Sequence, residues 1–184
     1  MSTEKQVVHP EVVDQPENWE TLNREVQASG RVQNFIEDAI ATPDGQTMVR
    51  QWVGHPGAVA VMAMDDRGRI AVVHQYRHPV GYRLVEPPAG ILDIDGEPAV
   101  EAAKRELAEE AELAASDWRT LVDIFTSPGG LQESIRIFVA RGLSTAPLPD
   151  GFEVEGEETD MGLYWLPLDQ LVEMIYAGQV QSPT

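Results

Sequence analysis

The sequence of 184 residues lacks cysteine altogether and carries only 13 Lys and Arg against 31 Asp and Glu. Without cysteine, a disulfide framework, a zinc–thiolate site and a thiol nucleophile are all excluded. The formal net charge of -18 repels nucleic acid and anionic membrane surfaces, so we expect neither as a partner. An anionic ligand would need bound cations or a few well-placed arginines to offset this charge.

Long apolar runs are missing too. The N-terminal stretch MSTEKQVVHPEVV lacks the basic start and continuous apolar run of a signal peptide, and no later segment is apolar enough to span a bilayer. We therefore expect a cytoplasmic protein, and its 42% hydrophobic content is enough for one sizeable core. Ser182 and Pro183 resemble the opening of another helix, which would make this sequence shorter than the natural chain.

Strand patterns dominate the first half of the chain, after a polar start at residues 1–22 that we expect to be partly ordered. Residues 30–54 contain the turn Pro43-Asp44-Gly45 between two strand patterns, which predicts an N-terminal β-hairpin. Two more apolar strands, separated by the turn DDRG, predict a second hairpin near the centre of a sheet. Further strands are expected at residues 82–86, 118–125, 134–143 and 162–168, and helices at 98–114 and 168–178.

Paired strands followed by flanking helices predict an α+β fold, with a mixed β-sheet sandwiched between helices and an N-terminal β-hairpin extension. We assign residues 1–56 to this extension and residues 57–184 to the main domain. The extension offers a strand edge and apolar residues that a second copy of the chain could cover.

The helix predicted at residues 98–114 has an apolar stripe and an acidic side. The stripe recurs at steps of three and four residues, which is typical of a helix face turned to the core. Its members are Val100, Ala103, Leu107, Ala111 and Ala114. Glu106, Glu109 and Glu110 are spaced i, i+3 and i+4, so they share one other sector of the helix.

An acidic helix side is most often a solvated surface, but here a Gly-Pro-rich loop leads directly into it. Clustered carboxylate oxygens suit hard divalent cations, and Mg²⁺ in particular binds a few carboxylates together with substrate phosphates. We interpret the triplet as a site for Mg²⁺, with Mn²⁺ as the alternative.

The residues around this triplet resemble the Nudix hydrolase box. Arg105-Glu106-Leu107, Glu109-Glu110 and Leu113 match its second half, and Glu97 stands the required eight positions before Arg105. Two departures occur: six residues rather than five separate Gly90 from Glu97, and Glu112 replaces the glycine that ends the box.

The resemblance implies that Glu106, Glu109 and Glu110 hold the metal, and that Glu110 thereby takes part in catalysis. The carbonyl oxygen of Ala89, beside the box glycine Gly90, would join the metal shell. Arg105 is expected to be structural, because a bridge to Glu97 or Glu109 would fix the helix and its loop.

Three more stretches resemble the ADP-ribose pyrophosphatase branch of that family: EPPAGILD, SPGGLQES and EETDMGLYWLPLDQL. The resemblance covers residues 46–177 and implies Mg²⁺-dependent hydrolysis of ADP-ribose to AMP and ribose 5-phosphate. It also implies a homodimer that shares the N-terminal strands and builds the nucleoside pocket across the interface. Another nucleoside diphosphate sugar or a dinucleotide is the alternative substrate, because the box identifies the bond rather than the groups on either side.

Four residues outside the box are candidates for binding substrate. Glu86 and Glu133 would lie against a ribose or help to place the metals, while Arg50 and Arg77 could bind the phosphates or the nucleoside. Plain alternatives stand beside each: Arg50 on one face of an edge strand, the two glutamates at surface strand ends, and Arg77 paired with a nearby acid.

The general base of the resembling enzymes is a glutamate in the loop before the last strand. Aligning Asp160-Met161 with their acid–aliphatic pair places the base at Glu157, with Glu158 second and Glu155 third. Such a loop can bring a carboxylate inward after substrate binds. A solvated acidic loop is the alternative.

Two further readings belong to other classes of function. A non-hydrolytic ligand-sensing module would usually lack box carboxylates and carry a DNA-binding extension, and this chain does neither. A purely structural acidic domain would leave its glutamates solvated. Titration with metal followed by product analysis separates all three readings.

Overall fold

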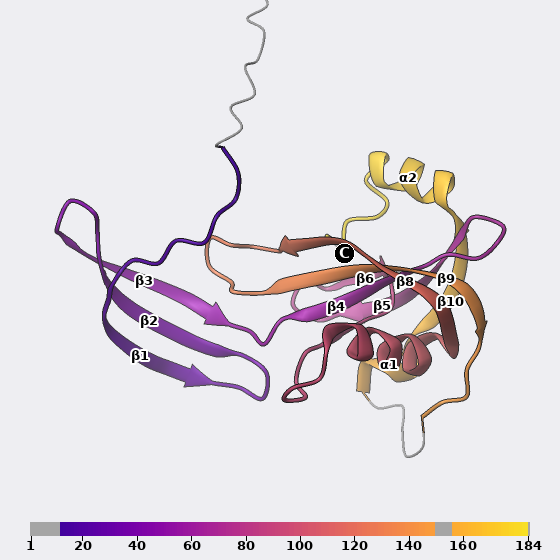
Figure 1. Cartoon of the computed structure of the whole chain (residues 1–184), viewed down its shortest axis with the longest axis horizontal. Coiled ribbons are helices and arrows are strands. Elements are labelled where there is room, and N and C mark those ends of the chain that lie inside the picture. Colours follow the sequence, from indigo (N-terminus) through magenta and orange to yellow (C-terminus); the bar gives the residue numbers. More distant parts are fainter. Residues whose placement is uncertain (1–11, 150–155, 184) are drawn as a thin grey trace, which may run out of the picture.

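The structure is a computed structural model that describes residues 12–149 and 156–183, without the side chains of Glu157 and Glu158 (Figure 1). Within these ranges, seven strands precede the first α-helix, and the second α-helix follows the last strand, much as the sequence predicts. The strands are β1 (Thr21–Ser29), β2 (Asn34–Ala41), β3 (Thr47–Gly54), β4 (Ala58–Ala63), β5 (Arg69–Arg77), β6 (Tyr82–Glu86), β7 (Ala89–Ile91), β8 (Leu113–Phe125), β9 (Ser134–Thr145) and β10 (Gly162–Pro167). The helices are α1 (Ala99–Ala111), the 3₁₀ helix η1 (Gly156–Asp160) and α2 (Leu168–Tyr176).

The N-terminal strands form an antiparallel sheet of their own, in the order β1-β2-β3 (Figure 1). The predicted hairpin is present as β2 and β3, with Gly45 at φ 82° in its turn. The sequence does not predict strand β1, because residues 21–29 show no regular alternation of apolar and polar side chains. All of β1 is exposed, so it is held mainly by its backbone pairing with β2.

The remaining strands form two sheets, β7-β4-β9-β8 and β10-β5-β6, in which β4 and β9 are parallel and the other pairs antiparallel. The predicted hairpin of β4 and β5 is therefore wrong in part. The turn forms, with the Gly68 N–H donating to the Asp65 carbonyl at 3.0 Å, but only Met64 and Ile70 bridge the two strands. Both strands are largely buried, and each pairs with other partners.

The two α-helices lie on opposite sides of these sheets, as Figure 1 shows. Leu107 of α1 packs with Val59 and Val61 of β4, and all three are fully buried. On the other side, Leu171 of α2 packs with Ile70 of β5. This arrangement agrees with the expected α+β sandwich. Within the described ranges, neither helix has the length and apolar character needed to cross a membrane.

Helix α1 ends one turn earlier than its apolar stripe suggests, at Ala111, and Ala114 lies exposed on β8. Glu112 follows the helix with φ 52°, in the left-handed region, and its N–H reaches back to the Ala108 carbonyl at 3.1 Å. This is the position at which the Nudix box has glycine. A residue with a Cβ atom pays a steric cost in this conformation, whereas glycine does not.

We expect Glu112→Gly to raise the free energy of unfolding by about 1 kcal/mol and Tm by roughly 2–4 °C, because it relieves this backbone strain. Glu112→Ala is the matched control, since it removes the carboxylate but keeps the Cβ atom and gains nothing from the backbone. Urea or thermal unfolding measures both. Equal stabilisation by the two variants would mean that charge, and not the left-handed backbone, sets the effect.

Candidate functional site

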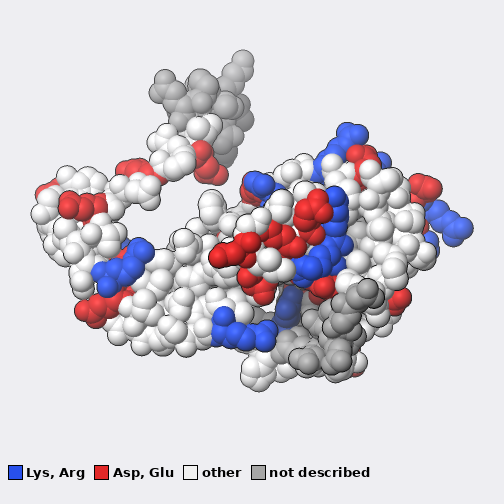
Figure 2. Space-filling model, turned by 60° about the horizontal axis from the view of Figure 1, so that its bottom comes forward, with Lys and Arg blue, Asp and Glu red and all other residues white. Residues whose placement is uncertain are grey.

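The acidic sector of α1 is organised around Arg105. Its Nη1 donates to Glu106 at 2.7 Å and to Glu109 at 3.1 Å, and its Nη2 donates to Glu97 at 3.3 Å. Arg105 therefore ties the end of the box loop, at Glu97, to the helix, as its predicted structural role requires. Figure 2, which brings the α1 side forward, shows acidic side chains gathered beside basic ones on this face.

Strand β7 closes the other side of the cluster. The Ala89 N–H donates to Glu110 Oε2 at 2.9 Å, so Glu110 reaches from α1 to the strand. A Cβ atom added at Gly90 would lie 2.0 Å from the carboxylate carbon of Glu106, so the Glu106 side chain would have to move away from β7. Gly90 is therefore required for the close approach of Glu106 to the β7 backbone.

Burial and the charge of Arg105 shift the pKa of Glu106 in opposite directions. Burial, with the negative charge of Glu109, raises the pKa of Glu106 from its ordinary 4.5 to about 7, although Arg105 opposes the shift. The surrounding carboxylates raise the pKa of Arg105, which stays charged. Three carboxylates share the single positive charge of Arg105, so the cluster favours a further cation.

The donor set fits a divalent metal ion, although the carboxylates are not yet gathered around one point. Across residues 12–149 and 156–183, no three acidic or histidine side chains already form a cation-binding group. Glu106 and Glu109 turn to Arg105 and Glu110 turns to Ala89. Hard carboxylate oxygens on a partly buried helix face are nevertheless the ligands that Mg²⁺ and Mn²⁺ accept.

In the metal-free protein, we expect the Glu106 contribution to stability to be lost as the pH rises from about 4.5 to about 7. Over this window the unfolded chain releases the Glu106 proton before the folded protein does, so the folded state loses up to about 3 kcal/mol. Urea unfolding in a chelator at several pH values measures it. Glu106→Gln, which has no proton to release, is the control, and identical pH profiles for both proteins would contradict the assignment.

A cavity of about 470 Å³ opens beside β7 and brings together five of the residues predicted from the sequence. Ala89 and Gly90 form its boundary with the acidic cluster, and they are also in contact with Glu110 and Glu106. The other three predicted residues that line it are Arg77, Glu86 and Glu133. The cluster and the cavity therefore form one continuous candidate site.

Glu86 is buried, with 6% of its surface exposed, so its alternative placement at a surface strand end is wrong. Its Oε2 accepts from Arg77 Nε at 2.9 Å and from Gln75 Nε2 at 3.1 Å, and its Oε1 accepts from the Ser182 hydroxyl at 2.7 Å. Arg77 thus pairs with a nearby acid and still lines the cavity. The contact with Ser182, 96 residues away, has no signal in the sequence.

Glu133 also faces the cavity and is held from two sides. Its Oε2 accepts from the Thr126 hydroxyl at 2.7 Å, and its Oε1 lies 3.7 Å from Nε2 of His55. Neither partner of Glu133 has a signal in the sequence. His55 stands in a connection before Pro56, and nothing in the sequence around it indicates that it reaches the loop after β8.

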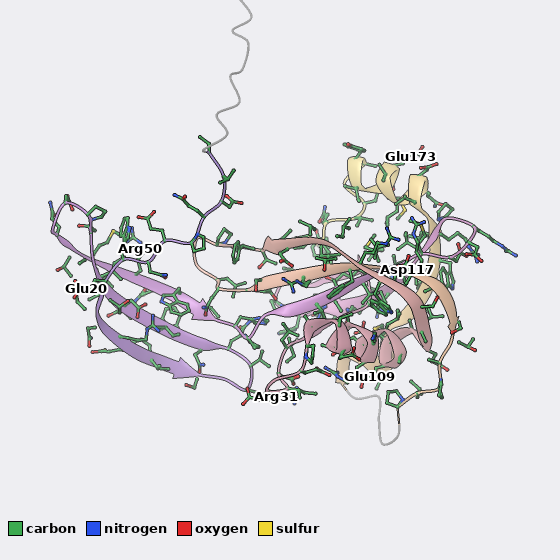
Figure 3. All side chains as sticks on the ribbon, viewed as in Figure 1. Glu20, Arg31, Arg50, Glu109, Asp117 and Glu173 are labelled. Atoms are coloured by element: carbon green, nitrogen blue, oxygen red, sulfur yellow. The ribbon has the colours of Figure 1, made fainter. Side chains whose placement is uncertain are left out.

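Arg50 is not brought to the cavity within one chain. It lies on β3 opposite Asp38 of β2, where its Nη1 donates to the Val49 carbonyl at 3.0 Å. Figure 3 labels Arg50 and Glu109 and shows them in different parts of the molecule. The alternative placement of Arg50 on a strand face describes its position in the single chain.

The candidates for the general base are only partly described. Glu157 and Glu158 belong to η1, but their side chains, and the whole of Glu155, lie outside the described residues. The end of η1 is anchored, because Arg83 Nη1 donates to the Asp160 carbonyl at 2.8 Å. The segment also packs against β5.

Comparisons with known proteins agree with this geometry. A family model described as NUDIX domain matches residues 54–182. An ADP-ribose pyrophosphatase of Mycobacterium tuberculosis is 42% identical over 163 residues, which cover 89% of this chain and 77% of the relative. A methanol dehydrogenase activator of Bacillus methanolicus is 39% identical over 155 residues, which cover 84% of this chain and 82% of the relative.

A solved structure of an ADP compounds hydrolase superimposes with a TM-score of 0.72 at 22% identity, over 89% of this chain and 86% of that one. At this identity the match supports the fold alone. The family model, by contrast, spans well over half of the chain and includes both α1 and the residues around the cavity. On that match and on the 42% identical relative, the chain belongs to the Nudix hydrolase family.

Proposed function

We propose that this protein is an Mg²⁺-dependent pyrophosphatase that hydrolyses ADP-ribose to AMP and ribose 5-phosphate. One observation carries the proposal: the partly buried carboxylates of α1 meet, at Ala89 and Gly90, a cavity lined by Arg77, Glu86 and Glu133. The relative named as an ADP-ribose pyrophosphatase supports the choice of substrate.

Glu106, Glu109, Glu110 and the Ala89 carbonyl would hold the metal. When bound there, a divalent cation would neutralise charge on the diphosphate and lower the pKa of a bound water molecule. An inert diphosphate linkage needs both effects, because its anionic oxygens otherwise repel a nucleophile. Arg105 does not bind substrate in this scheme but keeps the carboxylates oriented through its contacts with Glu97, Glu106 and Glu109.

The cavity residues bind and orient the substrate. Arg77 uses Nε to hold Glu86, which leaves its terminal nitrogens as donors for a phosphate oxygen. Glu86 and Glu133 are hydroxyl acceptors, a chemistry that suits the terminal ribose. Glu157 is the proposed base that takes the proton from the attacking water. The water oxygen forms a bond to one phosphorus, the bond between that phosphorus and the bridging oxygen breaks, and the second phosphate leaves with the bridging oxygen.

The test is a substrate panel of ADP-ribose, other nucleoside diphosphate sugars and dinucleotides, assayed with Mg²⁺, with Mn²⁺ and with a chelator. We expect AMP and ribose 5-phosphate from ADP-ribose, and no product in the chelator. Hydrolysis in water labelled with ¹⁸O identifies the attacked phosphorus. Faster turnover of another nucleoside diphosphate compound would reassign the substrate, and no turnover of any would favour a ligand-sensing module.

We also propose that residues 1–56 form a dimerisation element. Phe35 and Val49 lie on one face of the N-terminal sheet with 40% and 54% of their surfaces exposed, which is costly for a lone domain. Arg50 lies on the same sheet and away from its own cavity. In a homodimer that covers this sheet, Arg50 could bind the nucleoside or the phosphates in the cavity of the partner subunit.

A dimer is expected by light scattering at micromolar concentration. Arg50→Ala should raise KM for ADP-ribose without changing the oligomeric state, because it removes a forked donor and leaves the apolar contact intact. Phe35→Asp should instead weaken the dimer. A fully active monomer would contradict both the assembly and the role of Arg50.

A further inference from the structure

The segment that connects the N-terminal sheet to the rest of the protein is hydrogen-bonded to the loop between β8 and β9, which carries Glu133. At the end of β3, the Val53 N–H donates to the Gly130 carbonyl at 2.8 Å, and the Val53 carbonyl accepts from the Gln132 N–H at 2.9 Å. Val53 and Leu131 form a parallel bridge between these contacts. The chain then passes from β3 into β4, as can be followed in Figure 1, through a short link that contains His55.

His55 is held in one orientation within this link. Its side chain is only 6% exposed, and its Nδ1 accepts the Gly57 N–H at 3.1 Å. A neutral imidazole that accepts at Nδ1 carries its proton on Nε2, so this hydrogen bond assigns the tautomer. Gly57, at φ 96°, supplies the turn that makes the contact possible.

The protonated Nε2 of His55 faces the Glu133 carboxylate from inside the protein. The 3.7 Å between Nε2 and Oε1 is longer than a hydrogen bond, so the contact is a weaker attraction between the N–H dipole and the carboxylate charge. The other carboxylate oxygen is fixed by the Thr126 hydroxyl at 2.7 Å. Both His55 and Glu133 line the cavity, together with Arg77 and Glu86.

We propose that His55 is a positioning residue that holds Glu133 at the substrate cavity and couples its orientation to the end of the N-terminal sheet. His55 does not act as a base here, since Nδ1 is occupied and Nε2 is a donor. The inference rests on the proposed function in one respect only, namely that Glu133 contacts the substrate. The competing explanation is that His55 merely completes the turn by accepting the Gly57 N–H.

Two substitutions separate these explanations, because each keeps one half of the imidazole. His55→Gln can place an amide N–H near the position of Nε2 but loses the acceptor for Gly57. His55→Asn can keep an acceptor near Nδ1 but no longer reaches Glu133. A positioning role predicts about a tenfold loss of kcat/KM in His55→Asn and a loss of about threefold or less in His55→Gln.

A double-mutant cycle with Glu133→Gln isolates the interaction. In the Glu133→Gln background, His55→Asn should cost little more, because the carboxylate that it holds is already gone. Thermal unfolding of every variant controls for damage to the turn. If both His55 variants lose activity, strong coupling to Glu133 still supports the proposal, whereas additive losses overturn it. Rescue by Asn but not by Gln, or no loss in either, also overturns it.

A readout without turnover keeps this proposal distinct from the proposed function. Nitrogen-15 correlation spectra of the wild-type protein should show His55 as the tautomer protonated on Nε2, with a signal that shifts in Glu133→Gln. A ring protonated on Nδ1, or a signal insensitive to Glu133, overturns the proposal whatever the substrate. If the panel identifies a substrate other than ADP-ribose, the proposed function fails. The positioning role of His55 is then tested by the same kinetic series with that substrate.

Discussion

Replacing Glu110 with Gln is expected to lower turnover at saturating Mg²⁺ by about 10²-fold or more, while the fold survives. The amide has the same size and keeps an oxygen that can accept the Ala89 N–H, which now donates to Glu110 at 2.9 Å. What the substitution removes is the negative charge that would hold the cation. The measurement is kcat over a range of Mg²⁺ concentrations, with thermal unfolding of the same samples.

Two other positions on α1 serve as controls for this prediction. Glu101→Gln neutralises a carboxylate that is 53% exposed and pairs with Lys104, so turnover should stay normal. Leu107→Ala removes a fully buried side chain and should cost roughly 2–5 kcal/mol of stability. A near-normal rate for Glu110→Gln at saturating Mg²⁺ would show that the three-carboxylate site is wrong.

Helix α1 and its charged cluster could be predicted because both depend on spacing within one short segment. Ala103 and Leu107 are buried as the stripe predicts, and Arg105 contacts Glu97 and Glu109 as the box resemblance implies. The one error in this segment, the length of the helix, comes from Glu112. Propensity favours a glutamate inside a helix, and the left-handed conformation is imposed by the turn into β8.

Contacts between distant segments could not be predicted in the same way. The partners of Glu86 come from β5 and from Ser182, and those of Glu133 include His55 of the link after β3. Periodicity describes which face a residue occupies but not which strand lies beside it. The misassigned pairing of β4 and β5 has the same cause. Two buried strands joined by a tight turn have the sequence pattern of a hairpin even when each pairs with other strands.

Replacing Glu157 with Gln is expected to reduce kcat by about 10²-fold or more with little change in KM, whereas Glu158→Gln should reduce the rate only modestly. Proton transfer to the base occurs in the transition state, so its loss leaves substrate binding almost intact. Both residues belong to η1, whose end is anchored by the contact of Arg83 with Asp160. The two substitutions therefore compare adjacent positions of the same short helix.

Steady-state kinetics of both variants at several pH values decides the assignment, because loss of the base also removes its limb from the pH profile of kcat. A large loss of kcat in Glu158→Gln, with a normal kcat in Glu157→Gln, would mean that the alignment through Asp160-Met161 is shifted by one residue. Normal rates in both would place the base elsewhere, with Glu155 as the next variant to measure. In every case Glu110→Gln provides the contrast, since it should raise the Mg²⁺ concentration needed for half-maximal rate and leave the pH limb of the base in place.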